Sequence, residues 1–281
     1  MASASAVFRR GVKVASAAAD RWRPSVPGVV ILLYHRVGGG SALEIDLDAA
    51  RFDEQIAVIA ESGRVVSLAA ALAQLAAAPG EGPADSSVVV TFDDGTADFA
   101  EIAVPILERH GVPATLYLAT GFVDGEIPVP AGGRPVSWSA LRDACSTGLI
   151  DIGSHTHTHR LLDRVSRSEA AAELDRSIDL IGEHLGQPAL DFAYPKAVPG
   201  RRDVVALVND RFRSAALAGT RVNPFRSDEP RRATDPQRLA RSPIQASDGM
   251  DFFARKLAGG MGLEDAFRRA INRVRYARLA T

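Results

Sequence analysis

The chain alternates between short apolar runs and longer segments in which the apolar residues have helical spacing. The runs Val29–Tyr34 and Val88–Phe92 are almost entirely apolar, which is typical of parallel strands that are buried on both faces. Between them, residues 52–61 place apolar side chains three or four positions apart, as an amphipathic helix does. Such alternation predicts an α/β fold with a parallel barrel or a doubly wound sheet.

The same patterns predict further elements along the chain. We expect helices over residues 68–75, 100–110, 139–147, 166–185, 204–209 and 263–279. We expect strands over residues 114–119, 149–153, 190–194 and 214–218. Ser166 and Glu169 have the spacing of a capping box at a helix start, and the Gly- and Pro-rich segment 121–135 predicts a loop over one end of the domain.

Composition narrows the class of protein. The chain has 281 residues, 46% of them hydrophobic, and a net charge of -1 from 33 basic and 34 acidic residues. This balance argues against a nucleic-acid partner, and no apolar run is long enough to predict a membrane span. The single cysteine, Cys145, excludes an intrachain disulfide. Since Met1–Pro24 lacks a strong apolar core, we expect a cytoplasmic protein, with peripheral membrane contact as the alternative.

Two adjacent carboxylates, Asp93 and Asp94, follow the run Val88–Phe92 directly. Barrel enzymes place their catalytic groups at the carboxyl ends of parallel strands. Burying two carboxylates together is costly unless a cation or a proton is shared between them. The Asp-Asp-Gly sequence also suits a simple turn that ends the strand and caps a helix, so both interpretations stay open at this point.

Three of the six histidines lie within five residues, at positions 155, 157 and 159. His155 and His159 are four positions apart, and on a helical turn this spacing places both imidazoles on one face, as in many metal sites. Two imidazoles and one carboxylate form a facial ligand set that leaves positions open for water and substrate. A solvated polar loop is the alternative interpretation.

Together the sequences Thr-Phe-Asp-Asp-Gly and Ser-His-Thr-His-Thr-His, about 60 residues apart, resemble those of the polysaccharide deacetylases, also called the NodB-homology or carbohydrate esterase 4 family. The resemblance extends from about Pro27 to Ile244. It includes the segment around Trp138 and the sequence Phe-Ala-Tyr-Pro at residues 192–195. It implies a distorted (β/α)7 barrel, in agreement with the alternation described above.

The resemblance also implies a reaction and a role for each motif residue. Asp94, His155 and His159 would bind one divalent metal ion, zinc or alternatively cobalt or nickel. Asp93 would act as the general base toward the metal-bound water that attacks the acetamide carbonyl. The backbone N–H of Tyr194 would help to hold the developing oxyanion. The implied activity is the removal of N-acetyl groups from an N-acetylated sugar or glycan.

The chain departs from the family pattern at the residue that steadies the base. Many members carry an arginine in the third motif for this purpose, whereas this chain has Ala193. Lys196, Arg201 and Arg241 are candidates to replace the missing charge, and the sequence does not choose among them. The changed segment Phe-Ala-Tyr-Pro-Lys-Ala also gives weight to another class of function, a catalytically degenerate carbohydrate-binding module.

A second departure concerns the general acid. Family members commonly carry a late histidine for this role, but this chain has none after His184. His35 follows the first strand in a Tyr-His motif that resembles the poly-N-acetylglucosamine deacetylase branch. The first and last strands of a closed barrel are neighbours, so we predict that His35 protonates the leaving amine. The alternative is a structural histidine at the end of the strand.

The remaining predictions concern substrate and organisation. Tyr194, Trp138 and Arg241 are the predicted substrate contacts, although a tryptophan before a helix is often part of the core. We divide the chain into an N-terminal segment 1–26, helical or disordered, a catalytic barrel 27–250 and a C-terminal helical extension 251–281. The expected substrate is a nucleotide- or lipid-linked sugar, and the enzymatic alternative is hydrolysis of a non-sugar C–N bond in an amide or imide.

Overall fold

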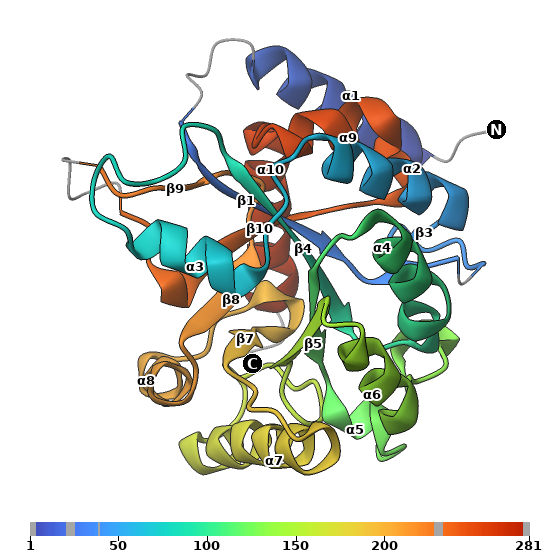
Figure 1. Ribbon diagram of the computed structural model, residues 1–281, viewed down its shortest axis with the longest axis vertical. Coiled ribbons are helices and arrows are strands. Elements are labelled where there is room, and N and C mark those ends of the chain that lie inside the picture. The colour runs from blue at the N-terminus through green and yellow to red at the C-terminus, as the bar shows by residue number, and fades with distance from the viewer. Residues whose placement is uncertain (1–3, 21–25, 39, 228–232, 278–281) are drawn as a thin grey trace.

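The computed structural model describes residues 4–20, 26–38, 40–227 and 233–277. Within these residues, seven parallel strands form a closed barrel in the order β10-β8-β7-β6-β5-β4-β1, and pairing of β1 with β10 closes it (Figure 1). The strands are β1 (Gly28–Tyr34), β4 (Ser87–Asp94), β5 (Ala114–Leu118), β6 (Ile150–Ser154), β7 (Asp191–Ala193), β8 (Ser214–Ala218) and β10 (Leu239–Pro243). The predicted α/β fold of the (β/α)7 type is confirmed.

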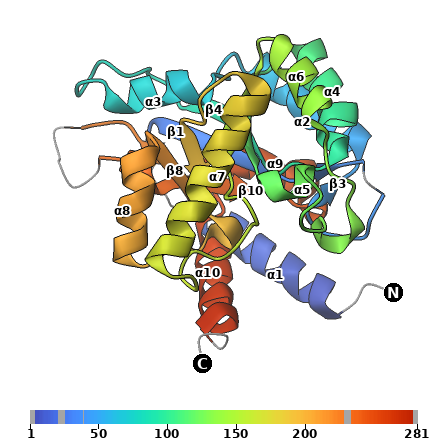
Figure 2. The same cartoon turned by 90° about the horizontal axis from the view of Figure 1, so that it is seen from below.

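The helices surround the barrel (Figures 1 and 2). They are α1 (Ala4–Ala19), α2 (Ala49–Glu61), α3 (Leu68–Ala76), α4 (Val104–His110), α5 (Thr120–Val123), α6 (Trp138–Ser146), α7 (Arg167–Leu185), α8 (Arg202–Arg211), α9 (Gly249–Leu257) and α10 (Gly262–Ala277). The capping box at Ser166 and Glu169 is present at the start of α7, as predicted. Helix α6 begins earlier than predicted because the side chain of Ser137 accepts from the N–H of Ala140 and caps the helix.

The carboxyl ends of the central strands meet at one level. In the register of β1 and β4, Leu33 lies opposite Thr91, and in the register of β1 and β10 it lies opposite Pro243. Asp93 and Asp94 are the last two residues of β4, paired with β5, rather than part of a turn after the strand. Side chains that follow the buried strands therefore converge at this end of the barrel.

Some elements were not predicted. Strand β10 has the polar sequence Leu-Ala-Arg-Ser-Pro, which lacks an apolar run, and the short pair β2 (Arg36–Val37) and β3 (Asp46–Leu47) lies outside the barrel. Strand β9 (Asn223–Pro224) runs antiparallel to the start of β1. The predicted loop 121–135 contains most of α5 and a short 3-10 turn. These elements are too short or too polar to give a periodic signal.

The first and the last helix of the described chain lie together beside the barrel. Helices α1 and α10 are neighbours in Figure 2, and the ring centroids of Phe8 and Phe267 are 5.4 Å apart. Lys13 of α1 donates to the buried Asp248 (2.7 Å), and Lys256 of α9 donates to the same carboxylate (2.9 Å). This buried ion cluster ties the N-terminal helix to the segment after β10. Residues 278 and 279 of the predicted C-terminal helix lie outside the described residues.

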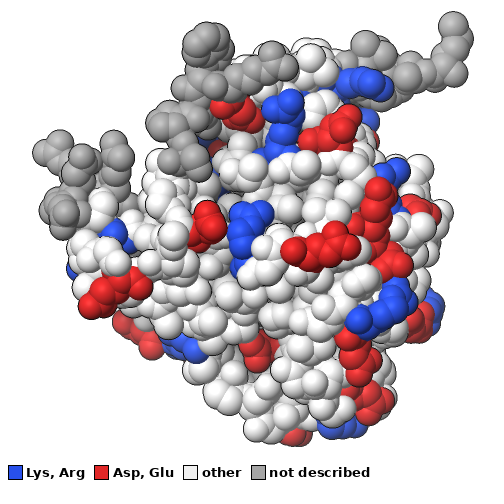
Figure 3. Space-filling model, turned by 45° about the horizontal axis from the view of Figure 1, so that its top comes forward, with Lys and Arg blue, Asp and Glu red and all other residues white. Residues whose placement is uncertain are grey.

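Charges of both signs are interspersed on the face shown in Figure 3. This pattern agrees with a chain whose acidic and basic residues nearly balance. In the described ranges, no helix combines the length and the apolar character needed to cross a bilayer.

Candidate active site

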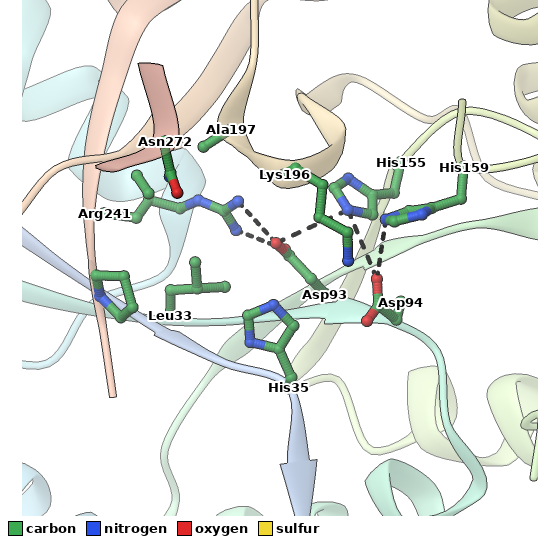
Figure 4. Close-up of a pocket in the computed structure, with 12 residues that line it drawn as sticks. Leu33, His35, Asp93, Asp94, His155, His159, Lys196, Ala197, Arg241 and Asn272 are labelled. Carbon is green, nitrogen blue, oxygen red and sulfur yellow. Dashed lines mark hydrogen bonds and ion pairs between the residues drawn. The ribbon is translucent and has the colours of Figure 1, made fainter. Parts of the chain in front are cut away.

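A pocket of about 170 Å³ opens at the carboxyl ends of the barrel strands (Figure 4). Most of the residues singled out from the sequence lie on its walls. The lining includes Leu33, His35, Asp93, Asp94, His155, His159, Lys196, Ala197, Arg241 and Asn272. The structure thus brings together β1, β4, β10, the loop after β6, the turn after β7 and helix α10.

Asp94, His155 and His159 form one cluster of donor atoms. The Nε2 atoms of His155 and His159 lie 3.7 and 3.4 Å from Oδ1 of Asp94, and one donor atom from each residue lies within 4.8 Å of the other two. Such separations suit ligands that share one ion, with metal–ligand bonds of about 2.0–2.2 Å. A carboxylate and two imidazoles fit a divalent transition metal and leave positions open for water and substrate.

The backbone at the donors is not helical, which corrects the interpretation of the histidine spacing. Thr156 and His159 have φ values of 66° and 54°, so the segment is an irregular loop. Glu173 of α7 holds this loop, because its carboxylate accepts from the N–H (2.7 Å) and the hydroxyl (2.5 Å) of Thr158. The loop therefore brings His159 beside Asp94 through an anchored turn rather than a helical face.

The tautomer of His155 follows from its partner. Its Nδ1 lies 2.7 Å from the carbonyl oxygen of Ala193, and a carbonyl can only accept, so Nδ1 carries the proton. The lone pair of Nε2 is then directed toward the cluster, an arrangement that is common for metal-binding histidines. His157, between the two donors, instead contacts Thr120 (2.8 Å) and Glu126 (2.9 Å).

Burial and charge prepare these donors for a cation. Burial lowers the pKa of His155, and burial together with the neighbouring His155 lowers the pKa of His159 to about 3. Burial would raise the pKa of Asp94, but the nearby His35, His159 and His155 lower it overall. At neutral pH the set therefore consists of one carboxylate and two neutral imidazoles, so a metal ion displaces no proton from the histidines.

Arg241 is the cation that lies beside Asp93, the candidate base, and holds it in place. Nη1 and Nη2 of Arg241 donate to the two carboxylate oxygens of Asp93 at 2.6 and 2.9 Å, and both side chains are buried. Arg241 also stacks over the ring of Tyr117, with 4.9 Å from Cζ to the ring centroid. Arg201 instead pairs with Asp203 at 3.4 Å, and Lys196 makes no ion pair with Asp93 within the described chain.

The arginine keeps Asp93 ionised in a buried position. Burial would raise the pKa of Asp93, but the charge of Arg241 and its hydrogen bonds outweigh this effect and the pKa is about 2. Each carboxylate oxygen keeps acceptor capacity beyond its bond to the guanidinium. Asp93 is therefore a fixed, ionised acceptor adjacent to the donor cluster.

His35 lies on another wall of the pocket, at the end of β1 (Figure 4). Its charged form would lower the pKa values of both Asp93 and Asp94, which reflects its proximity to the two carboxylates. Its buried Nδ1 has no hydrogen-bond partner among the described residues. No side chain in the described ranges therefore engages this nitrogen.

Two predicted substrate contacts have other partners. The N–H of Tyr194 donates to the carbonyl of Ala216 at 3.1 Å in the barrel, so it is not free to bind an oxyanion, and the side chain is buried. Trp138 stacks on His184 with 4.4 Å between ring centroids, donates to Asp124 at 2.8 Å and does not line the pocket. Sequence spacing alone could not show these contacts.

Several pocket residues have a left-handed backbone. Asp94 has a φ of 77°, and Lys196 and Ala197 have φ values of 54° and 56°. This conformation costs a residue with a side chain about 1–2 kcal/mol, and such strain is concentrated at functional sites. Gly95 also has a positive φ (95°), and a Cβ there would lie 2.3 Å from a Leu118 methyl carbon, so only glycine fits.

Comparisons with known sequences agree with this site. The family model for polysaccharide deacetylases matches residues 80–211. YxkH of Bacillus subtilis is 24% identical over 165 residues, which cover 59% of this chain and 55% of YxkH. A poly-beta-1,6-N-acetyl-D-glucosamine N-deacetylase of Staphylococcus aureus is 29% identical over 117 residues, which cover 39% of this chain and 40% of that enzyme. The chain thus spans about half the length of these relatives or less.

Solved structures share the fold. The deacetylase PplD of Streptococcus pyogenes, determined with acetate, has a TM-score of 0.67 and 20% identity, covering 82% of this chain and 98% of PplD. IcaB of Ammonifex degensii has a TM-score of 0.68 and 22% identity, covering 82% of this chain and 97% of IcaB. At these identities the likeness establishes the barrel architecture.

Proposed function

We propose that this chain is a metal-dependent hydrolase of the polysaccharide deacetylase family, whose model matches residues 80–211, and that it removes N-acetyl groups from an N-acetylated sugar or glycan. One observation carries this proposal. Asp93, ionised and fixed by Arg241, adjoins the donors Asp94, His155 and His159 on the wall of one pocket. A base beside a cation site is the arrangement that activates water against an amide carbonyl.

Asp94, His155 and His159 would hold the ion, which we propose to be zinc. A divalent ion at this place would polarise the acetyl carbonyl and lower the pKa of water. The backbone supports the donors, since the Ala193 carbonyl fixes the ring of His155 and Glu173 fixes the loop before His159. This support resembles the way that outer partners orient ligands in metal sites generally.

Asp93 would accept the proton of the attacking water. Its two bonds to Arg241 keep the carboxylate in one orientation, so it needs no reorganisation when the proton is transferred. The buried pair also keeps the base ionised, which is the form that accepts a proton. Arg241 is therefore proposed as a positioning residue rather than the substrate contact expected from the sequence.

His35 would protonate the leaving amine. It lies on another wall of the pocket than His155 and His159, and its Nδ1 has no protein partner in the described chain. A base and an acid at separate positions allow one group to take a proton from water while the other delivers a proton to nitrogen. Pairing of β1 with β4 supports this assignment: Tyr34 lies opposite Phe92, so His35 and Asp93 both follow that pair at the same end of the barrel.

The contact of Arg241 with Asp93 weakens the case for a degenerate binding module. That alternative rested on the arginine missing at Ala193, and a guanidinium now reaches the same carboxylate from β10. Since the Staphylococcus aureus relative is named for poly-beta-1,6-N-acetyl-D-glucosamine, oligomers of this glycan are the first substrates to test. Cytoplasmic location, peripheral membrane contact and the division at residues 26 and 250 stay predictions.

The test is acetate release by the purified protein loaded with zinc or cobalt. The substrates are β-1,6- and β-1,4-linked N-acetylglucosamine oligomers, nucleotide-linked and lipid-linked N-acetyl sugars, and an imide for the non-sugar alternative. Chelated protein and Asp93→Asn serve as controls. We expect release that requires metal and falls by about 10²–10⁴-fold in Asp93→Asn.

Three outcomes of this panel separate the hypotheses. Release from a sugar that needs both the metal and Asp93 supports the proposal. Hydrolysis of the imide alone would shift the assignment to a non-sugar C–N bond. Tight metal binding without any release would overturn the enzymatic proposal in favour of a binding role.

A further inference from the structure

Lys196 places a cation in the pocket that the reaction described above does not use. It lines the pocket with the two aspartates and the histidines, and Figure 4 shows its side chain extending into that space. Within the described chain, its ammonium group has no ion pair or hydrogen bond. Arg241 differs, because Asp93 neutralises it. Lys196 is therefore the cation of this pocket that remains available to a ligand.

Lysine is rare in this chain, and Lys196 is the lysine that lines the pocket. Of the 33 basic residues, only Lys13, Lys196 and Lys256 are lysines. Two of them, Lys13 and Lys256, are buried against Asp248. The ammonium group is a compact point charge on a flexible stem, whereas arginine presents a planar fork. The third lysine places such a point charge at the pocket.

A fixed turn presents this side chain. Lys196 and Ala197 both have left-handed backbone conformations, with φ values of 54° and 56°. The N–H of Ala197 donates to the Tyr194 carbonyl (2.9 Å), and the N–H of Val198 donates to the Pro195 carbonyl (3.2 Å). These bonds hold the turn after β7 in place. Strained backbone of this kind persists where the surrounding structure enforces it, often at ligand sites.

The charge of the pocket favours an anion. Both carboxylates of the pocket already have partners, since Asp93 binds Arg241 and Asp94 lies beside His155 and His159. Lys196 is a positive charge without such a partner among the described residues. Asn272 of α10 lines the same pocket and offers a neutral amide on the side of Ala197 and Arg241 (Figure 4). An ammonium group without a protein partner can form a charge-assisted hydrogen bond with an anionic group of a ligand.

We propose that Lys196 forms an anion-recognition subsite, so that the preferred substrate carries a carboxylate or phosphate group close to the acetamide that is hydrolysed. This inference rests on the proposed deacetylase function and adds the chemical class of its substrate. An N-acetylated sugar acid and a sugar phosphate share the required negative charge. The experiment below distinguishes these two sources.

The experiment compares sugars that differ mainly in charge. Zinc-loaded full-length protein is given N-acetylglucosamine, N-acetylglucosamine 1-phosphate or N-acetylmuramic acid, and kcat/KM for acetate release is measured. The variants are Lys196→Met, Lys196→Arg and the control Arg202→Met, which removes an equal charge from an exposed position at the start of α8. Binding of the same sugars to zinc-loaded Asp93→Asn, with and without Lys196→Met, is measured by calorimetry.

We expect the wild-type protein to prefer one of the anionic sugars over the neutral sugar by about tenfold. Lys196→Met should abolish this preference, while kcat/KM for the neutral sugar should change by less than about twofold. Lys196→Arg should retain most of the preference, and Arg202→Met should behave like the wild type. A preference for the phosphate or for the carboxylate identifies the source of the charge.

The inference would be overturned if the wild type shows no preference, or if Lys196→Met lowers turnover of all three sugars equally. The second result would assign Lys196 to the reaction rather than to recognition. Absence of acetate release would contradict the proposed function, and the calorimetry would still decide the subsite. An anionic sugar that binds more tightly than the neutral sugar, and only when Lys196 is present, would support the anion-recognition subsite. Equal binding of all three sugars would refute it.

Discussion

The walls of the pocket come from two regions of the chain with different origins. One wall, which we call the motif wall, belongs to the stretch that matches the family model, residues 80–211. It carries Asp93, Asp94, His155 and His159. The other wall is the seam where β1 meets β10, and it carries His35 and Arg241, which both lie outside that stretch. The proposed metal donors therefore come from one region, while the groups proposed to hold the base and to supply the acid come from the other.

This difference shows what closure of the barrel contributes. Ile31 of β1 lies opposite Arg241 of β10, so pairing of the two strands fixes the guanidinium at the level of Asp93 near the end of β4. An open sheet with the same motifs would keep the donor cluster but would leave Asp93 buried without its cation. Such a carboxylate would be costly to ionise. The seam thus completes a site that the motif wall only begins.

The largest effect is expected on the motif wall, from His155→Ala. This change removes one of the three proposed metal donors, so zinc should be lost on dialysis and acetate release should fall by at least about 10³-fold. His157→Ala is the matched control, because His157 lies between the donors but bonds Thr120 and Glu126. Metal content by mass spectrometry and kcat/KM decide the result. Equal metal loss in both variants would contradict the assignment of donors.

Arg241→Met tests the seam and should have the next largest effect. Removing one partner of a buried ion pair should lower the free energy of unfolding by about 3–5 kcal/mol. Activity should fall by about 10²-fold because the base loses its fixed orientation. Arg211→Met is the control, since Arg211 pairs with Asp175 at the surface and such pairs contribute about 0–1 kcal/mol. Urea denaturation and kinetics measure both effects.

Arg241→Met should also shift the pH dependence of the rate in one direction. In the wild type the pKa of Asp93 is lowered from 3.8 to about 2, so the pair contributes stability that is present above about pH 4 and is lost as the pH falls toward 2. Without the cation, burial raises the pKa of Asp93. The acid limb of the rate profile should therefore move to higher pH in the variant. An unchanged acid limb would show that Asp93 is not the base.

The motif wall could be predicted from the sequence because its chemistry is local. Asp93 and Asp94 follow the strongest apolar run, and the histidines follow the next strand but one, so parallel strands alone bring them together. The structure places them in one pocket, although in an irregular loop rather than a helical turn. The loop conformation depends on Glu173 in α7, and no spacing within the motif reveals that contact.

The seam could be predicted only in part. His35 was identified from its resemblance and from the expected closure of the barrel, but Arg241 was one of three candidate cations. Strand β10 has no apolar run, so its position and register depend on long-range pairing with β1 and β8. The partner of the Tyr194 N–H could not be predicted for a similar reason, because its bond to the Ala216 carbonyl depends on a neighbouring strand.

His35→Gln tests the proposed acid on the seam, and its expected loss of activity is similar to that of Arg241→Met. Glutamine keeps a polar side chain but cannot deliver a proton, so kcat for a sugar acetamide should fall by about 10²-fold. The loss should be much smaller for p-nitroacetanilide, because its amine leaves more readily without protonation. His110→Gln is the control, since His110 bonds Asp53 away from the pocket. An equal loss for both substrates would indicate a structural histidine instead.

Trp138→Ala should have the smallest effect on activity and sharpens the boundary of the motif wall. The indole stacks on His184 and donates to Asp124, and it does not line the pocket. Its loss should destabilise the protein by about 1–2 kcal/mol through these contacts. A stacking contact between Trp138 and the sugar would appear as a rise in KM when the indole is removed. Since Trp138 does not line the pocket, we expect kcat/KM on N-acetylglucosamine oligomers to change by less than about twofold. A rise in KM with oligomer length would instead place the sugar chain over Trp138 and extend the site beyond the pocket.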